Sequence, residues 1–338
     1  MRVGIAGVGR IGMMHASLLA THPLVEELVI CDPFPGRAAE VVGALGGRAV
    51  DSVDAFVAFE MDAVVIATST ASHADVVESF CRRGTPVFCE KPVAMDLERT
   101  SDVARTQSET GTLVQVGFQR RFDPGYVELR RRVTAGELGE IRRMHLVSAD
   151  PAPPPPAFIS TSGGIFRDLL IHDFDLVRWV TGREVTQVWA TGTNRGASYF
   201  GEAGDMDEAI VVVTMDDGTI ASIHGSRYNG AGYDVRMEVA GTDATSMAGL
   251  DAQLPVTSSE PGPAILTGPA WRIFADRFAA AYAAELTAFL DTVSSHGSSL
   301  CTVTDGYQAL LIAEAADLSA RSRRPVSLDE VRSQEIRL

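Results

Sequence analysis

The chain has 338 residues, which is enough for two domains of ordinary size. A hydrophobic content of 46% and a charged content of 22% are typical of globular proteins and exclude disordered and fibrous classes. The net charge of −15 makes nucleic acid and anionic membranes poor partners, because an acidic surface repels both, and it suits a small neutral molecule.

The expected location of the chain is the cytoplasm. The first predicted strand begins at Arg2 and leaves no room for a signal peptide, and no apolar run approaches membrane-spanning length. The cysteines have no metal-type or redox-type spacing, so we interpret them as reduced, structural thiols. They are Cys31, Cys81, Cys89 and Cys301.

Over residues 1–118, short apolar runs alternate with amphipathic stretches. Strands separated by helices pair in parallel, so we expect a doubly wound α/β sheet. The predicted strands are Val3–Ala6, Leu28–Cys31, Ala63–Ala67, Val87–Cys89 and Leu113–Val116, and the predicted helices cover 11–21, 35–45, 73–83 and 97–110.

A glycine-rich segment, Gly7-Val8-Gly9-Arg10-Ile11-Gly12, joins the first predicted strand to the first predicted helix. In this setting its GxGxxG spacing is the Rossmann fingerprint for dinucleotides. Gly7 permits a tight turn, Gly9 lets backbone amides approach a pyrophosphate, and Gly12 allows the helix to pack closely on the strand. The alternative is a glycine turn that binds no ligand.

Asp32 closes the second predicted strand, twenty residues after Gly12, where the fingerprint places an acid. Its carboxylate can accept hydrogen bonds from an adenosine ribose and would repel a 2′-phosphate. Pro33 follows directly, and Arg37 is the nearest cation in the sequence. The sequence therefore favours NAD over NADP as the cofactor.

Residues 119–338 are expected to form a second, α+β domain on an open, mainly antiparallel sheet, with the C-terminal helix packing back on other elements. The turn signal at 216–218 separates two strand-like runs, and the proline-rich stretch 150–156 excludes a helix or an inner strand. The predicted strands lie near 140–148, 185–193, 207–215, 218–226 and 234–240, the predicted helices cover 124–135, 165–180, 271–294 and 305–320, and 251–269 is expected to be a loop.

Arginines gather early in this second domain, with acidic residues between them. We interpret them as a solvated or subunit-facing surface. They are Arg120, Arg121, Arg130, Arg131, Arg132, Arg142 and Arg143.

The tripeptide Glu90-Lys91-Pro92 follows the strand Val87–Cys89, at the carboxyl edge where doubly wound sheets hold their ligands. A lysine there can hydrogen-bond an oxygen atom and stabilise developing alkoxide charge. On its own, the tripeptide is equally compatible with an ordinary strand exit.

A second polar group lies in the predicted helix 165–180. Asp168, His172 and Asp175 are spaced i, i+4 and i+7, which places them on one face of an otherwise apolar helix. Buried polar side chains need partners, so three together indicate a functional site. The alternatives are a histidine satisfied within the core, a metal site for which the sequence offers no further ligand cluster, and the solvated face of the helix.

These motifs together resemble the glucose–fructose oxidoreductase and inositol dehydrogenase family over almost the whole chain, and its inositol 2-dehydrogenases in particular. The resemblance implies an N-terminal Rossmann domain that binds NAD, and a C-terminal open sheet through which such proteins often form tetramers. It is carried by the glycine fingerprint, Thr68-Ser69-Thr70-Ala-Ser-His73, Glu90-Lys91-Pro92, Gly117–Pro124, Asp150–Pro155, Ser162–Asp168 with His172, and Gly232–Arg236.

By position, the resemblance assigns catalysis to Lys91, Asp168 and His172. It also implies a cis Lys91–Pro92 bond. The implied cofactor contacts are Gly7, Gly9, Arg10, Ile11, Gly12, Asp32, Thr68, Ser69, His73, Glu90 and Gln119, with His73 and Glu90 bordering the nicotinamide ribose. The implied substrate contacts are Lys91, Asp150, Asp168, His172, Asp175 and Tyr233.

Two residues depart from the family pattern. Leu170 stands where these enzymes often have a hydroxyl residue, and Ala149 stands where arginine is common. Both departures bear on which polyol is the substrate.

The reaction implied is NAD-dependent oxidation of a secondary hydroxyl on a cyclic polyol, with myo-inositol or another inositol isomer as the expected substrate. His172 suits the role of base, because an imidazole has an ordinary pKa near 6.5, which lies close to the working pH. Asp168 would orient it, Lys91 would position the reacting oxygen, and no metal is required. The alternatives are an aldose or other polyol dehydrogenase, an enzyme that uses NAD transiently to eliminate or hydrolyse a glycoside, and a non-catalytic NAD sensor.

Overall fold

The computed structural model of the protein describes residues 1–259, 261 and 268–335. The chain divides into two compact units. The first comprises Met1–Gln119 and Ala280–Gln308, and the second comprises Arg120–Ala279 and the residues from Ala309 onward. The sequence assigned all of 119–338 to one domain, whereas 280–308 belongs to the first unit. The loop expected at 251–269 lies partly outside the described residues.

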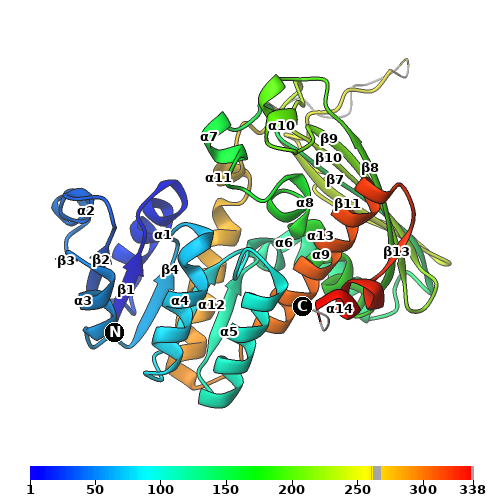
Figure 1. The fold of residues 1–338 in the computed structure, drawn as a ribbon. Coiled ribbons are helices and arrows are strands. Elements are labelled where there is room, and N and C mark those ends of the chain that lie inside the picture. Colours follow the sequence, from blue (N-terminus) through cyan, green and yellow to red (C-terminus); the bar gives the residue numbers. More distant parts are fainter. Residues whose placement is uncertain (260, 262–267, 336–338) are drawn as a thin grey trace. The chain divides into compact units, whose positions relative to one another are not determined.

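The first unit is built on six short strands and the helices between them (Figure 1). The strands are β1 (Arg2–Ala6), β2 (Glu27–Cys31), β3 (Arg48–Val50), β4 (Ala63–Ile66), β5 (Val87–Glu90) and β6 (Val114–Gly117). The helices are α1 (Arg10–Ala20), α2 (Arg37–Leu45), α3 (Val53–Ala58), α4 (Thr70–Cys81), α5 (Leu97–Thr110) and α12 (Ala279–Ser295).

All neighbouring strands of this sheet are parallel, in the order β3-β2-β1-β4-β5-β6. That order is the Rossmann order, which confirms the doubly wound fold predicted from the sequence. Parallel sheets are covered on both faces, and β4 is accordingly buried along its whole length. The strand β3 and the helix α3 were not predicted.

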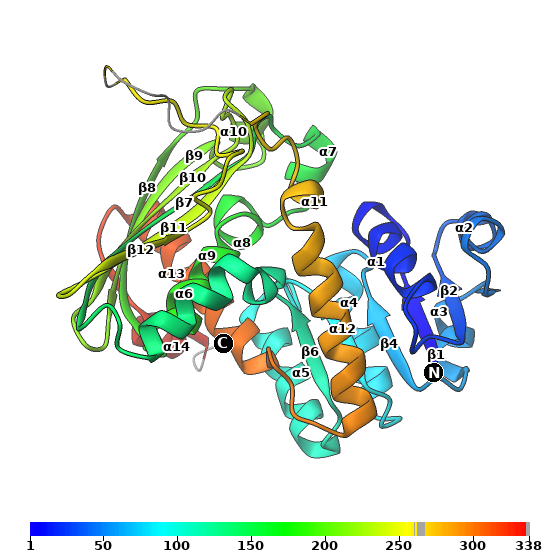
Figure 2. The same ribbon diagram turned by 180° about the vertical axis from the view of Figure 1, so that it is seen from behind.

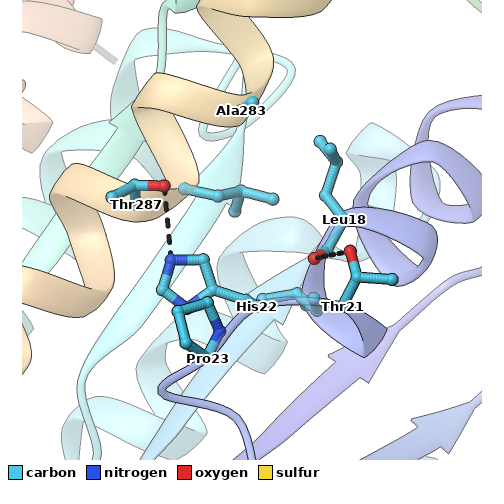
Figure 3. Close-up of a pocket in the computed structure, with 8 residues that line it drawn as sticks. Leu18, Thr21, His22, Pro23, Ala283 and Thr287 are labelled. Carbon is cyan, nitrogen blue, oxygen red and sulfur yellow. Dashed lines mark hydrogen bonds between the residues drawn. The ribbon is translucent and has the colours of Figure 1, made fainter.

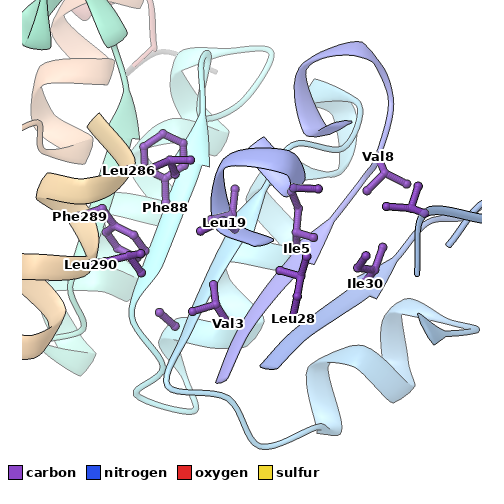
Figure 4. Packing of buried hydrophobic residues seen from close by; sticks show 14 of the residues in the cluster. Val3, Ile5, Val8, Leu19, Leu28, Ile30, Phe88, Leu286, Phe289 and Leu290 are labelled. Atoms are coloured by element: carbon purple, nitrogen blue, oxygen red, sulfur yellow. The ribbon is translucent and has the colours of Figure 1, made fainter. Parts of the chain in front are cut away.

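The helix α12 supplies part of the first unit's core. Its side chains Leu286, Phe289 and Leu290 pack in one buried cluster with the strand residue Phe88 and the α1 residue Leu19 (Figure 4). These side chains are almost fully removed from water, so α12, which lies late in the chain, stabilises the first unit by burying apolar surface.

The second unit carries a seven-stranded sheet and several helices (Figure 2). The strands are β7 (Ile141–Ala149), β8 (Val185–Thr193), β9 (Glu208–Met215), β10 (Ile220–Ser226), β11 (Asp234–Gly241), β12 (Thr245–Ala248) and β13 (Val326–Ser327). The helices are η1 (Gln119–Phe122), α6 (Pro124–Thr134), α7 (Pro156–Ile159), α8 (Ile165–Asp168), α9 (Ile171–Thr181), α10 (Ser198–Glu202), α11 (Phe274–Arg277), α13 (Val303–Ser322) and α14 (Leu328–Glu335), with η1 and α13 crossing the boundary between the units.

The sheet has the order β12-β11-β7-β10-β9-β8-β13. Only β7 and β10 pair in parallel, and the other neighbours are antiparallel, so the predicted mainly antiparallel sheet is confirmed. The helices α6 and α9 contact one face of the sheet. On the opposite face, alternate side chains of the strands remain partly exposed, Trp189, Ile210 and Ile220 among them.

The single helix expected at 165–180 is wrong, because the chain breaks between α8 and α9. The backbone N–H groups of Leu169 and Leu170 both donate to the carbonyl oxygen of Ile165, which ends α8, and the next helix begins at Ile171. Leu170 is fully buried, and its side chain packs against Gly225 of β10. Tertiary packing at an apolar residue therefore sets the break, which helical periodicity cannot reveal.

Within the described residues, no helix combines the length and the apolar character needed to cross a bilayer.

Candidate active site

The glycine loop between β1 and α1 has the geometry of a dinucleotide cradle. Gly7 has a φ of +85°, and a Cβ there would lie 2.6 Å from the carbonyl oxygen of Ala67. A Cβ on Gly12 would lie 1.9 Å from the carbonyl oxygen of Gly7, so the helix can pack here only without a side chain. At Gly9, by contrast, a Cβ would meet nothing within 4 Å. That open space at the start of α1 fits the pyrophosphate of a dinucleotide.

Asp32 lies directly after β2 and is held by the same loop. Its Oδ2 accepts the backbone N–H of Val8 at 2.8 Å, and its Oδ1 accepts that of Phe34 at 2.9 Å. The Arg37 guanidinium lies 3.7 Å from the carboxylate and stacks over the Phe34 ring. Because a carboxylate offers about four lone-pair sites, Asp32 keeps acceptor capacity for the hydroxyls of a ribose.

Replacing Asp32 with serine should narrow the preference for NAD over NADP in kcat/KM by about tenfold or more. A like charge at about 4 Å from a phosphate costs several kcal/mol near a protein surface, and the substitution removes it while leaving Arg37 in place. Steady-state kinetics with both cofactors would measure the ratio. Asp51→Ser, at the exposed end of β3, is the matched control, and an unchanged ratio in Asp32→Ser would show that another residue reads the ribose.

The loops after β4 and β5 are joined through His73. Its ring nitrogens lie 3.1 Å from the carbonyl oxygen of Thr68 and 2.9 Å from that of Pro92. Burial lowers the pKa of His73, although the two carbonyls oppose the shift. A neutral ring can donate to only one of the two carbonyl oxygens at a time, and the ring lies between the two loops. Ser69, which follows Thr68 directly, precedes α4.

Glu90, the last residue of β5, has a buried partner on α1. Its Oε1 lies 2.7 Å from Nε2 of His15, a fully buried residue of α1, and its Oε2 accepts the backbone N–H of Lys91 at 3.2 Å. The Lys91–Pro92 bond is cis, which confirms the prediction. The sequence alone left open whether Glu90-Lys91-Pro92 is an ordinary end of a strand. In the structure Glu90 contacts His15 of α1, the helix that begins within the glycine fingerprint.

The remaining predicted cofactor residues of the first unit lie at the same carboxyl edge or at the start of α1. Arg10 is exposed and begins α1, Ile11 follows half-buried, and Gln119 is buried just after β6. The roles of these residues toward NAD stay predictions.

A fully buried acid, Glu285 of α12, lies near Glu90 and was missed from the sequence. Among the described residues, neither of its carboxylate oxygens has a hydrogen-bond partner, and the Gln115 amide donates only to its backbone oxygen. Burial, and then the charge of Glu90, raise the pKa of Glu285 well above its ordinary value. Glu285 therefore keeps its proton to a higher pH than an exposed glutamate does.

The buried carboxyl of Glu285 should make the stability of the protein depend on pH. Above the ordinary pKa of 4.5 the unfolded chain loses the Glu285 proton while the folded chain keeps it, so stability falls as pH rises, until the raised pKa is reached. Glu285→Gln removes that slope, about 1.4 kcal/mol per pH unit. Urea unfolding at several pH values should show the variant's advantage over the parent growing with pH. Parallel curves for the variant and parent would contradict it, and the exposed Glu109→Gln on α5 is the control.

A small pocket of the first unit is lined by other residues. It is formed where the end of α1 meets α12, and His22 lies 3.3 Å from the hydroxyl of Thr287 within it (Figure 3). None of its lining residues belongs to the predicted constellation, so we assign it no role.

In the second unit, Asp150 and Asp168 are brought together by a residue that the sequence analysis missed. Arg227, directly after β10, donates to Oδ2 of Asp150 at 3.0 Å and to Oδ2 of Asp168 at 2.9 Å. Its side chain is only 3% exposed. The sequence shows it only as one arginine after a predicted strand, and its pairing depends on the parallel register of β7 and β10.

The acids of α9 are paired with arginines that were expected at the surface, and for Arg120 and Arg121 that expectation is wrong. Arg121 forms a two-pronged ion pair with Asp175, and Arg120 donates to Asp173 at 2.9 Å, with all four side chains almost fully buried. Ser148 of β7 donates to the same Asp173 carboxylate at 2.7 Å. Asp175 is thus held in an ion pair, and its contact with substrate stays a prediction.

His172 and Tyr233, the other two predicted residues of the second unit, are both buried. His172 lies in the first turn of α9, separated from Asp168 by the break in the chain. Tyr233 precedes β11, its backbone N–H donates to the carbonyl oxygen of Trp271, and burial raises the pKa of its hydroxyl. Among the described residues, no group of three or more His, Cys, Asp or Glu side chains is arranged to hold a metal ion.

In comparison with known proteins, two family models match separate parts of the chain. Residues 1–118 match an oxidoreductase family with an NAD-binding Rossmann fold, and residues 126–246 match the GFO/IDH/MocA C-terminal domain. The chain is 37% identical to the inositol 2-dehydrogenase of Rhizobium meliloti, covering 97% of this chain and 99% of that protein. It is 39% identical to a myo-inositol dehydrogenase of Streptomyces leeuwenhoekii, covering 95% and 98%. The crystal structure of scyllo-inositol dehydrogenase from Lactobacillus casei with bound NAD(H) and scyllo-inositol superposes with a TM-score of 0.88 at 29% identity, covering 97% and 99%.

Proposed function

We propose that this chain, which belongs to the GFO/IDH/MocA family of oxidoreductases with an NAD-binding Rossmann fold, oxidises a secondary hydroxyl of an inositol to a ketone. We infer the class of substrate mainly from two carboxylates, Asp150 and Asp168, which Arg227 holds together. Carboxylates accept hydrogen bonds from neutral hydroxyls, which suits a polyol and would repel an acidic substrate. The inositol dehydrogenases that resemble the chain over nearly its full length support the same class.

The reaction breaks the C–H bond of one ring carbon and the O–H bond of the hydroxyl on that carbon. Bound NAD supplies the hydride acceptor, at C4 of the nicotinamide. His172 takes the hydroxyl proton, and Lys91 donates a hydrogen bond to the oxygen while negative charge develops on it. Asp150, Asp168 and Tyr233 hold other hydroxyls of the ring, and the further role of Asp168 in orienting the imidazole remains a prediction.

A panel of inositol isomers and common sugars, each incubated with the purified chain and NAD, tests the proposal. We expect NADH to form with myo-inositol or a close isomer and more slowly with aldoses. NADH formation with an aldose but with no inositol would contradict the substrate and leave the hydride chemistry standing. Conversion of a glycoside without net NADH would indicate elimination or hydrolysis instead, and binding of NAD without any turnover would indicate a sensor.

The open face of the second sheet supports a homo-oligomer, and a tetramer with two-fold axes is the arrangement we propose. Trp189, Ile210 and Ile220 are 39%, 41% and 50% exposed on that face. Trp189 of β8 lies opposite Val212 of β9, so the side chains of these two apolar residues are neighbours on the face. An exposed apolar face of this kind is a liability in a monomer.

Light scattering should therefore give a mass about four times the 36.0 kDa of one chain. Placing charges on the face with Trp189→Asp and Ile210→Lys should lower the mass, because charged side chains would be desolvated in the interface. Ile273→Lys, at a residue outside the sheet that is 49% exposed, is the control. A parental mass near that of a single chain would contradict the proposal.

We also propose that the chain acts in the cytoplasm. All four cysteines are buried and none forms a disulfide, which suits a reducing compartment, and NAD-dependent oxidation of a small polyol requires intracellular cofactor.

A further inference from the structure

Backbone hydrogen bonds at the ends of β7 and β10 fix the position of Arg227. The backbone N–H of Asp150 donates to the carbonyl oxygen of Ser226 at 2.9 Å, and the N–H of Asn229 donates back to that of Asp150 at 2.7 Å. The N–H of Arg227 itself donates to the carbonyl oxygen of Asp207 at 2.8 Å. These bonds prevent Asp150 and Arg227 from sliding past one another, because each is anchored through its own backbone or its neighbour's.

Asp168 reaches the same guanidinium from a different element. It ends the short helix α8, whose start is fixed by Asp205, since Oδ1 of Asp205 accepts the backbone N–H of Ile165 at 2.8 Å. The two carboxylates bound by Arg227 thus come from the end of β7 and the end of α8. A planar guanidinium can span two such acceptors at once, whereas an ammonium offers a single charged point.

The electrostatics of this group depend mainly on Arg227, which is buried between the two carboxylates. Burial would lower the pKa of Arg227, but the charges of Asp168 and Asp150 outweigh that effect and raise it. Burial raises the pKa of Asp150, and Arg227 opposes the shift. Without the guanidinium, desolvation would favour the protonated form of Asp150. The other titratable or charged groups that face this cluster are Asp205, Asp207, Arg120 and Tyr233.

We propose that Arg227 is a positioning residue for the reaction, which holds Asp150 and Asp168 as a fixed pair of ionised acceptors for two hydroxyls of the substrate. An ionised carboxylate only accepts hydrogen bonds, whereas a protonated acid presents a donor where a hydroxyl also needs to donate. The spacing set by the guanidinium fork would therefore select which neighbouring hydroxyls fit. This inference rests on the proposed oxidation of an inositol.

Arg227→Gln tests it, with kcat/KM for the inositol measured over a range of pH. Leaving a buried carboxylate without its charged partner typically costs about thirtyfold or more in binding. We expect a loss of that size in kcat/KM, carried mainly by KM, with the KM for NAD unchanged. The acid limb of the profile should move to higher pH, because the carboxylates then protonate more readily, and part of the loss should be recovered at alkaline pH.

Arg227→Lys keeps the charge and loses the fork, so it carries the test if the glutamine variant does not fold. We expect its acid limb to stay near that of the parent while KM for the inositol rises by about tenfold. Arg236→Gln, which removes an arginine paired with Asp234 on the same sheet, controls for the loss of an ion pair and should change neither quantity.

The outcomes separate this inference from the function on which it rests. Suppose that the parent oxidises inositol and that Arg227→Gln and Arg227→Lys both keep the parent's KM for inositol and the acid limb of its pH profile. That result overturns the role of Arg227 and leaves the proposed function standing. If the folded variants lose thermal stability and activity together and pH moves neither, Arg227 is merely structural, and the inference is again overturned. A parent that oxidises no inositol removes the proposed function itself.

Discussion

Replacing His172 with alanine should lower kcat for inositol oxidation by about a hundred- to ten-thousandfold, the usual contribution of a general base. His172 is buried in the first turn of α9, within the second unit, whereas the glycine loop and Asp32 belong to the first. The substitution should therefore leave the affinity for NAD nearly unchanged. Stopped-flow or steady-state NADH formation gives kcat, and calorimetric titration with NAD gives the affinity.

The pH dependence of the same variant separates a base from a structural residue. In the parent, kcat should rise with pH as the imidazole loses its proton and then flatten, and in His172→Ala that rise should disappear. His172→Gln, which keeps a polar side chain without a basic nitrogen, should be as impaired as the alanine variant. His22→Ala, at the end of α1, is the control and should behave like the parent. A His172→Ala variant with near-parental kcat would refute the mechanism.

Replacing Lys91 with arginine should be almost as damaging as replacing it with alanine, with a loss in kcat of about a hundred- to a thousandfold for either. Lys91 is the only lysine of the chain, and every other one of the 29 basic residues is arginine. An arginine is planar, bulkier and permanently charged, whereas an ammonium is compact and can exchange its proton. A chain that uses arginine everywhere else therefore points to a specific need for an ammonium after β5.

Chemical rescue sharpens this second prediction. Small primary amines added to Lys91→Ala should restore part of kcat, while added guanidinium should not, because only the amine reproduces the missing group. Affinity for NAD should change less than turnover in all of these variants. Full activity of Lys91→Arg, or rescue by guanidinium as effective as rescue by an amine, would show that only positive charge is needed at this position.

The Rossmann sheet could be predicted because its strands are buried on both faces. Ala63–Ile66 is a continuous apolar run, which marks an inner parallel strand, and the glycine fingerprint has its required strand before it and helix after it. The edge strand Arg48–Val50 carries no such signal, because it has three residues and begins with an exposed arginine. Length and burial together decide which strands a sequence reveals.

The parts of the site that could not be predicted depend on tertiary contacts. The break between α8 and α9 falls at Leu169 and Leu170, whose apolar side chains fit an unbroken helix equally well. Charge patterns cannot distinguish a solvated arginine from Arg120, which is buried against an acid of α9. For Lys91, however, a signal lay in the composition, since a lone lysine among arginines is visible without any structure.

Transfer of a labelled hydrogen tests the central claim most directly. The parent enzyme would be incubated with NAD and with myo-inositol, or the isomer that turns over fastest, carrying deuterium on its ring carbons. We predict one deuterium on the nicotinamide ring of each NADH formed, together with a slower rate than with unlabelled substrate when hydride transfer limits turnover. Mass spectrometry of the isolated NADH gives the answer. NADH without deuterium, or a modified inositol formed while NAD stays unreduced and unlabelled, would contradict the account.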